Sequence, residues 1–270
     1  MTLADEPAVF DVSGVSYRYG DVVALDRLSM KVQRCQRVAL LGANGSGKST
    51  LLRLLDALYF PDAGSVSFLG EALTEDRFQD DDFAFGFRRR VGLVFQNPDV
   101  QLFCPSVFDE LAFGPLQLRI DPREIRDRVA QMMETLGIAH LKDRPPHQLS
   151  GGEKKRVAIG SVLVLDPEVI LLDEPMASLD PLSQTHIIDL LMNWGGSRKT
   201  IIAATHDLHV LEDIADECLI FERGRVIATG SPAAILHDRE LLVRSNLIHA
   251  HRHTVSGPEG HPHKGPHSAA

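Results

Sequence analysis

The residue pattern with the most direct chemical meaning is GANGSGKS, residues 42–49, which matches the form GxxxxGK[ST]. Glycines in such a loop let backbone N–H groups curl around phosphate oxygens, and a following helix start adds partial positive charge. The lysine can reach the β- and γ-phosphates, and the final serine can ligate Mg²⁺. We therefore expect a nucleotide phosphate site formed by Gly42, Asn44, Gly45, Ser46, Gly47, Lys48, Ser49 and Thr50.

A second chemical group follows the apolar run VILLD, residues 169–173. A buried strand of this kind delivers Asp173 at its carboxyl end, where the ligand sites of α/β proteins lie. Asp173 is the expected partner of Mg²⁺, directly or through water. Glu174 comes next and is placed to orient or deprotonate an attacking water molecule. Two adjacent acids could also form a surface turn, but beside a phosphate-binding loop they predict the second half of a nucleotide site.

The segment LSGGEKKR, residues 149–156, has two compatible interpretations. Ser150 and Glu153 have the spacing of a capping box at the start of a helix. A capped helix N-terminus that carries Gly151 and Gly152 is also a good ligand for a γ-phosphate. The sequence therefore predicts a helix after Ser150 whose first residues can bind phosphate.

An α/β framework is expected to position these residues, because short strand-like runs alternate with helical segments. We expect strands at 10–17, 28–32, 37–41, 65–69, 91–95, 169–173 and 200–205, the first two antiparallel, and a hairpin over 217–229. Helices are expected from Lys48, over 106–118, over 121–137, after Ser150 and over 180–195. The charge runs 80–82 and 88–90 are predicted to be solvated loop.

The expected domain organisation is a single α/β unit over residues 1–248 with a helical subdomain at about 97–165, where the strand pattern disappears. Residues 249–270 contain six of the twelve histidines and Val255 as the only large aliphatic residue. Such a segment cannot form a core, so we expect a disordered tail.

Composition narrows the class of protein further. With 270 residues, 44% of them hydrophobic and 24% charged, the chain is long enough for an ordinary globular core. A net charge of −9 gives no bulk attraction to nucleic acid or anionic lipid, so no nucleic-acid partner is expected. Three widely spaced cysteines without a CxxC pair indicate a reducing compartment. The longest apolar runs fall short of the ~20 residues that span a bilayer, and no secretory signal is readable, which favours a cytosolic protein.

In combination, the phosphate-binding loop, LSGGE, VILLDEP and the histidine after TIIAAT resemble the ATP-binding-cassette ATPases over roughly residues 8–240. The resemblance implies a P-loop NTPase fold with an antiparallel β subdomain and an inserted helical subdomain, and it implies ATP and Mg²⁺ as cofactors. It assigns adenine stacking to Tyr19, sensing of Mg²⁺ and water to Gln96, and contact with the γ-phosphate to His206. It further implies that residues 178–180 cross a dimer interface.

The resemblance also sorts the site residues by role. Catalytic roles fall on Glu174, His206, Gln96 and Lys48, and Mg²⁺ binding falls on Ser49, Asp173 and Gln96. The segment Ser150, Gly151 and Gly152 would serve the nucleotide held by an opposing subunit. The sequence departs from the common family pattern at Met176, Ser178 and Glu153, and none of these removes a group that acts on phosphate.

A finer resemblance comes from FQNPDVQLFCPSVFDELAFGP, residues 95–115. Its paired glutamines, Gln96 and Gln101, and the FGP after DE are similar to the ATPases of energy-coupling-factor importers, particularly the cobalt and nickel branch. This resemblance implies transmembrane importer subunits as partners and a peripheral position on the cytoplasmic face of the cell membrane. Because LSGGE is expected to lie far from its own phosphate-binding loop, we also expect a dimer with a second copy, which a near-identical paralogue could replace.

The histidine spacing in the tail bears on the solute. His249, His251 and His253, followed by His261 and His263, recur at every second position, and imidazole suits divalent nickel and cobalt. The tail could gather such ions, or it could be a solvated segment without a metal role. Together with the importer resemblance, it favours nickel over cobalt, with a vitamin as the main rival.

Two other classes of function remain open from the sequence. A soluble cassette ATPase of DNA repair or translation usually carries two cassettes or a long coiled-coil insertion, neither of which this sequence shows. A P-loop kinase or GTPase is disfavoured by LSGGE, by the acidic pair Asp173 and Glu174, and by the absence of an NKxD motif that would recognise guanine.

Overall fold

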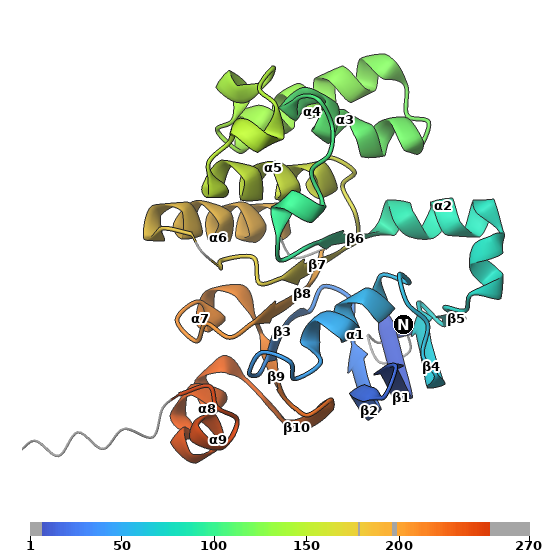
Figure 1. Ribbon diagram of the computed structural model, residues 1–270, viewed down its shortest axis with the longest axis vertical. Helices are drawn as coiled ribbons and strands as arrows, with labels where there is room; N and C mark the ends of the chain where they lie inside the picture. The colour runs from blue at the N-terminus through green and yellow to red at the C-terminus, as the bar shows by residue number, and fades with distance from the viewer. Residues whose placement is uncertain (1–6, 178, 196–198, 249–270) are drawn as a thin grey trace, which may run out of the picture.

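The structure, a computed structural model, describes residues 7–177, 179–195 and 199–248. Two sheets and the helices around them make up its layers (Figure 1). The smaller sheet is antiparallel, with the order β2-β1-β4-β5. Its strands are β1 (Phe10–Tyr19), β2 (Val22–Val32), β4 (Ala63–Phe68) and β5 (Glu71–Ala72). The expected antiparallel pair is confirmed, and both strands extend to the short turn between Tyr19 and Val22.

The larger sheet has six strands in the order β10-β9-β3-β8-β7-β6, all parallel except for β10. Its strands are β3 (Arg37–Leu41), β6 (Val91–Val94), β7 (Val169–Asp173), β8 (Thr200–Thr205), β9 (Glu217–Glu222) and β10 (Arg225–Gly230). Every residue of β7 and β8 is buried, as continuous apolar runs in a parallel sheet predict. The carboxyl ends of β3, β7 and β8 meet at one edge of this sheet.

Helices cover both faces of the larger sheet. Val38 and Leu40 of β3 join the core that holds α1 (Lys48–Leu55), whereas Ala39 and Leu41 face the opposite core. That opposite core contains side chains of α5 (Gly151–Leu163), α6 (Pro181–Gly195) and α7 (Leu211–Ile214). Helices α1 and α5 therefore lie on opposite faces of the sheet.

A third core joins α3 (Val107–Gln117), α4 (Pro122–Thr135) and α5, which stand together at one end of the molecule (Figure 1). Asp121 caps α4 by accepting from the N–H groups of Arg123 and Glu124, and Pro122 occupies its first turn. The capping box of Ser150 and Glu153 is present at the start of α5. The remaining elements are α8 (Pro232–His237), α9 (Arg239–Arg244), η1 (Asp76–Gln79), η2 (Pro98–Val100), η3 (Ala139–Leu141) and η4 (Pro146–Gln148).

The prediction that the charge runs 80–82 and 88–90 form solvated loop is wrong, because both belong to the helix α2 (Asp81–Arg90) and its cap. Asp80 caps the helix, and the three arginines hold it to three other elements. Arg88 donates to the carbonyl of Asp56, Arg89 to that of Leu118 at 2.7 Å, and Arg90 to Glu168 at 2.7 Å. The charges therefore anchor a helix whose apolar side, including the buried Phe87, packs on the smaller sheet.

In the part of the chain that the structure describes, no helix combines the length and apolar character that crossing a membrane requires.

Candidate nucleotide site

The loop between β3 and α1 has a backbone shape that requires glycine at two positions. A Cβ at Gly42, where φ is +154°, would lie 2.5 Å from the carbonyl oxygen of Phe221. A Cβ at Gly47, where φ is +111°, would lie 2.6 Å from the carbonyl oxygen of Ala24. Only glycine fits contacts this close, so the loop is packed against its own scaffold and presents its backbone rather than side chains. Asn44 and Gly45 lie exposed at its tip.

Lys48 begins α1 and points back under this loop. Its side chain is buried, with the residue 5% exposed, and Nζ donates to the carbonyl oxygens of Gly42 at 2.7 Å and Ala43 at 3.1 Å. Burial lowers the pKa of the ammonium, while the charges of Glu174 and Asp173 act in the other direction. The buried hydroxyl of Ser46 has no hydrogen-bond partner among the described residues. A buried cation and a free hydroxyl below a glycine loop form a cradle that fits phosphate oxygens.

Ser49 and Asp173 meet although they are 124 positions apart, with Ser49 Oγ donating to Asp173 Oδ1 at 2.9 Å. Asp173 ends β7 and is buried, which raises the pKa of its carboxyl, while the hydrogen bond from Ser49 lowers it. A hydroxyl oxygen and a carboxylate oxygen side by side are donors that Mg²⁺ prefers. The residues present therefore fit the predicted ion.

Glu174 is held in an uncommon backbone conformation directly after β7. Its φ is +47°, and its N–H donates to the carbonyl of Ala204 in the neighbouring strand β8 at 2.9 Å. Its buried carboxylate Oε1 lies 2.9 Å from Nδ1 of His206, whose side chain is 55% exposed. Positive φ in a residue other than glycine often marks a functional position, because the surrounding structure must hold the strain. Glu174 is thus a fixed carboxylate whose partner reaches solvent.

Tyr19 lies beside α1 at the end of β1. Its hydroxyl is 3.4 Å from Thr50 Oγ1 and accepts from Arg53 at 3.4 Å. Its ring packs edge-on against Tyr17 and Tyr59, with centroid distances of 5.1 and 6.0 Å, and it remains partly exposed. The structure therefore puts a supported aromatic ring next to the phosphate-binding loop.

Within this single chain, the predicted site residues do not all lie together. Gln96 is exposed and lies two residues beyond the end of β6. The strand ends at Val94, one residue earlier than the sequence predicted. Ser150 and Gly151 are exposed at the start of α5, whose helix covers the opposite face of the sheet from α1. Of the loop 178–180, Ser178 lies outside the described residues, as do the tail histidines from His249 onward.

Three polar side chains near this site received no site role from the sequence, although Gln101 and Glu110 belong to the segment that carries the finer resemblance. Lys155 donates to the carbonyl of Gln96, and Gln101 accepts from the N–H of Phe95. Buried Glu110 accepts from two backbone N–H groups of the same region. Lys155 stands among the charged residues Glu153, Lys154 and Arg156, so no local pattern distinguishes it.

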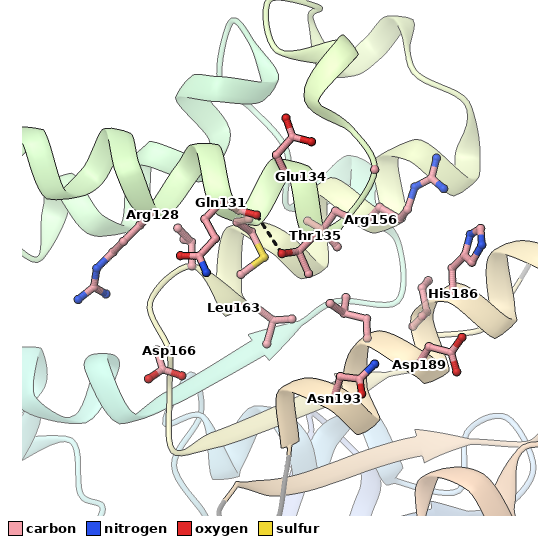
Figure 2. Close-up of a pocket in the computed structure, with 16 residues that line it drawn as sticks. Arg128, Gln131, Glu134, Thr135, Arg156, Leu163, Asp166, His186, Asp189 and Asn193 are labelled. Carbon is pink, nitrogen blue, oxygen red and sulfur yellow. Dashed lines mark hydrogen bonds between the residues drawn. The ribbon is translucent and has the colours of Figure 1, made fainter.

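Two cavities lie outside the phosphate loop. The first cavity has a volume of about 820 Å³ and is lined by residues of α4, α5 and α6. Figure 2 shows Arg128, Arg156 and His186 around it. No predicted site residue lines it. The other, of about 430 Å³, lies beside Glu174 and His206, with Leu247 and Ile248 on its far wall.

Comparison with known proteins identifies the family of this chain. The family model for ABC transporters matches residues 25–177. A nickel import ATP-binding protein, NikO, of Rhodobacter capsulatus is 54% identical over 242 residues, which cover 88% of this chain and 95% of the relative. An energy-coupling factor transporter ATP-binding protein, EcfA, of Methanothermobacter thermautotrophicus is 40% identical over 240 residues, which cover 88% and 76%.

A solved structure gives the same result for the fold. It is the dimeric structure of an ATP-binding cassette in a post-hydrolysis state, bound to ADP and Pi. It matches with a TM-score of 0.74 at 25% identity, over 83% of this chain and 98% of the other. The chain therefore belongs to the ABC transporter family and is one of its ATP-binding subunits, an ATPase coupled to transport. The family resemblance and the cassette fold expected from the sequence are confirmed.

Proposed function

We propose that this chain is the ATP-hydrolysing subunit of an energy-coupling-factor importer that carries nickel or cobalt ions. The observation that carries the catalytic part is the pair of contacts at the sheet edge, Ser49 with Asp173 and Glu174 with His206. The transport part is supported by the printed functions of the two relatives and by the segment 95–115.

ATP binding is assigned to the loop 42–50 and to Tyr19. The ammonium of Lys48 would exchange its carbonyl partners, Gly42 and Ala43, for β- and γ-phosphate oxygens. Charge-assisted bonds to phosphate are stronger than the neutral ones they replace, so the exchange favours nucleotide binding. The exposed face of the Tyr19 ring would stack on adenine.

The metal ion would be held by the hydroxyl of Ser49 and the carboxylate of Asp173, with the side-chain oxygen of Gln96 as a further donor. When bound, Mg²⁺ supplies positive charge that stabilises the phosphate oxygens. The hydrogen bond between Ser49 and Asp173 already brings two of the three donors together.

Hydrolysis is assigned to direct attack of water on the γ-phosphorus, without a covalent phosphoenzyme. Glu174 accepts a proton from the water while the water oxygen forms a bond to the γ-phosphorus. The bond between the γ-phosphorus and ADP breaks in the same step. His206 orients the Glu174 carboxylate and reaches the γ-phosphate. Lys48 stabilises the negative charge that develops on the β- and γ-phosphate oxygens as ADP leaves.

A dimer is part of the proposal, because the helix start at Ser150, Gly151 and Gly152 would serve the nucleotide of a second copy. In one chain this helix start and Lys48 belong to helices on opposite faces of the sheet. The cassette structure that matches this chain is dimeric and holds ADP and Pi. A near-identical paralogue could replace one copy.

The partner in the membrane would dock on an exposed apolar group beside the Gln96 segment. Val100, Phe103 and Leu116 are more than half exposed, and the rings of Phe103 and Phe113 pack edge-on at 4.9 Å. Buried Glu110 holds this loop by accepting from the N–H groups of Phe103 and Cys104 at 2.9 and 2.7 Å. An exposed apolar group on a fixed backbone suits an apolar helix of a transmembrane subunit at the cytoplasmic face.

Gentle purification of the full chain from membranes tests the assignment. Small hydrophobic subunits should co-purify, and cells with the transporter should accumulate Ni²⁺ or Co²⁺ only while ATP is supplied. Phe103→Ser should reduce co-purification without changing the melting temperature. ATP-driven uptake of a vitamin, without uptake of either metal ion, would contradict the assignment of the solute. An active ATPase that co-purifies with no membrane subunit would indicate a soluble cassette enzyme.

A further inference from the structure

Lys155 is a buried cation that the proposed chemistry does not use. It lies in α5 and is 2% exposed, and Nζ donates to the carbonyl oxygens of Gln96 at 2.9 Å and Phe95 at 3.2 Å. An ammonium taken out of water is costly unless it is hydrogen bonded, so these two bonds account for its position. Burial lowers its pKa to about 8, while the charges of Asp173 and Glu174 oppose the shift.

Gln101 holds the same backbone from its other side. Its Oε1 accepts from the N–H of Phe95 at 3.1 Å, and its Nε2 donates to Ala158 O at 2.8 Å and Ser161 Oγ at 3.1 Å. Lys155, Ala158 and Ser161 are spaced three residues apart, so they form one stripe on α5. The backbone of Phe95 and Gln96 is therefore bound to this stripe through both its N–H and its carbonyl groups.

These hydrogen bonds begin directly after the last β6 residue that pairs with the larger sheet. The β6–β7 ladder ends with the pairing of Val94 and Leu172, two residues before Gln96. Gln96 is exposed, so packing does not fix its side chain. The position of the side chain therefore depends on the position of its backbone. That backbone is fastened to the same helix that begins at Ser150, the residue assigned to a partner's nucleotide.

We propose that Lys155 is a positioning residue that fastens the Gln96 backbone to α5, so that Gln96 and the helix start at Ser150 move as one unit. The inference rests on the proposed function. A helix transmits a shift at its N-terminus along its length because its backbone is hydrogen bonded throughout. Contact of Ser150 with a partner's nucleotide would thereby set the position of Gln96 at the chain's own site, without contact between Lys155 and nucleotide.

Lys155→Met tests this assignment, because methionine keeps much of the volume and removes the ammonium. In the full-length chain we expect kcat for ATP to fall about tenfold or more, since misplacement of a positioned group is costly, while the Kd for MgATP stays within about twofold. Lys155→Gln retains N–H donors and should recover part of kcat. Lys31→Met is the control, because Lys31 is an exposed lysine of β2 that pairs with Asp11 at 2.8 Å in the smaller sheet rather than in α5.

A double-mutant cycle with Gln96→Ala separates positioning from general destabilisation. If Lys155 acts through Gln96, the double variant hydrolyses ATP no more slowly than Gln96→Ala alone. Losses that multiply would overturn the inference, and so would Lys155→Met at the wild-type rate. If Lys155→Met does not fold, Gln101→Leu removes the opposite side of the same attachment and must give the same non-additive result.

The same assay separates this inference from the proposed function. A wild-type chain no faster than a Glu174→Gln blank would overturn both. A wild-type chain that hydrolyses ATP, with Lys155→Met equally fast and equally stable, would overturn the role of Lys155 alone.

Discussion

His206 Nδ1 lies 2.9 Å from Glu174 Oε1, so the residues that directly follow two neighbouring strands share a hydrogen bond across the sheet edge. The parallel register pairs Asp173 of β7 with Ala204 of β8, which puts the residues that follow side by side. The φ of Glu174 is +47°, so its backbone departs from the extended conformation of the strand that it follows. The proposed base and the residue proposed to contact the γ-phosphate are therefore in direct contact.

Glu174→Gln should retain ATP binding and lose most turnover. The amide keeps the shape of the carboxylate but cannot accept a proton from water, so we expect kcat to fall by about 10²–10⁴. Phosphate release and nucleotide binding measured on the same protein check this. Glu153→Gln is the control, because glutamine preserves the capping box. Turnover of Glu174→Gln at the wild-type rate would contradict the assignment of the base.

Lys48→Ala should weaken ATP binding itself. The substitution removes a buried ammonium whose charge-assisted bonds to phosphate are each worth roughly 1.5–3 kcal/mol, so Kd should rise about tenfold or more. Equilibrium titration with a fluorescent ATP analogue measures the change. Lys31→Ala removes an exposed lysine that pairs with Asp11 and should leave Kd unchanged. Equal affinity in Lys48→Ala and wild type would exclude Lys48 from the phosphate site.

ATP should increase the dimer fraction of Glu174→Gln in sedimentation, because in the proposed dimer each copy supplies a helix start to the other's nucleotide. Adding Gly151→Glu should abolish this gain. A Cβ at Gly151 meets nothing within 4 Å in the single chain and an acid suits the first turn, so we expect the monomer to tolerate it. Its carboxylate would repel a γ-phosphate. A dimer that persists in the double variant would place the interface elsewhere.

Asp56 should give the unfolding free energy an unusual pH dependence. Burial raises its pKa from 3.8 to about 7, although Arg88 lowers it in part. The folded chain then holds a proton that the unfolded chain releases, so this contribution to stability is present below pH 4 and is lost as pH rises toward 7. Compared with Asp56→Asn, wild type should lose about 2 kcal/mol between pH 5.5 and 8. Urea unfolding of both proteins at the two pH values measures the difference, and parallel pH profiles would contradict the buried carboxyl.

Deletion of residues 249–270 tests the predicted metal role of the histidine-rich tail. Full-length protein should bind Ni²⁺ and Co²⁺ weakly at several sites in calorimetry, because alternating imidazoles are transition-metal ligands. The shortened chain should lose this binding and keep its ATP hydrolysis, because every residue assigned to ATP precedes the tail. If full-length protein binds neither ion and its transporter accumulates neither, the metal assignment fails while the ATPase assignment stands.

Local sequence determined much of the framework. The strands of the larger sheet, the Asp121 and Ser150 caps and the hairpin at Arg223 and Gly224 follow from patterns a few residues long. The phosphate-binding loop and the DE pair are likewise local, which is why the ABC transporter family could be inferred before the fold was known. Such features depend on neighbours in the chain, so their physical cause is written in adjacent residues.

Tertiary structure alone decided which side chains meet. The hydrogen bond of Ser49 with Asp173 joins positions 124 apart, and the bonds of Lys155 with Phe95 and Gln96 join positions about 60 apart. The arginines of α2 were mistaken for solvated loop because their partners belong to other elements. Residue types state what a side chain can bind, but sheet register and helix packing determine what lies within reach of it.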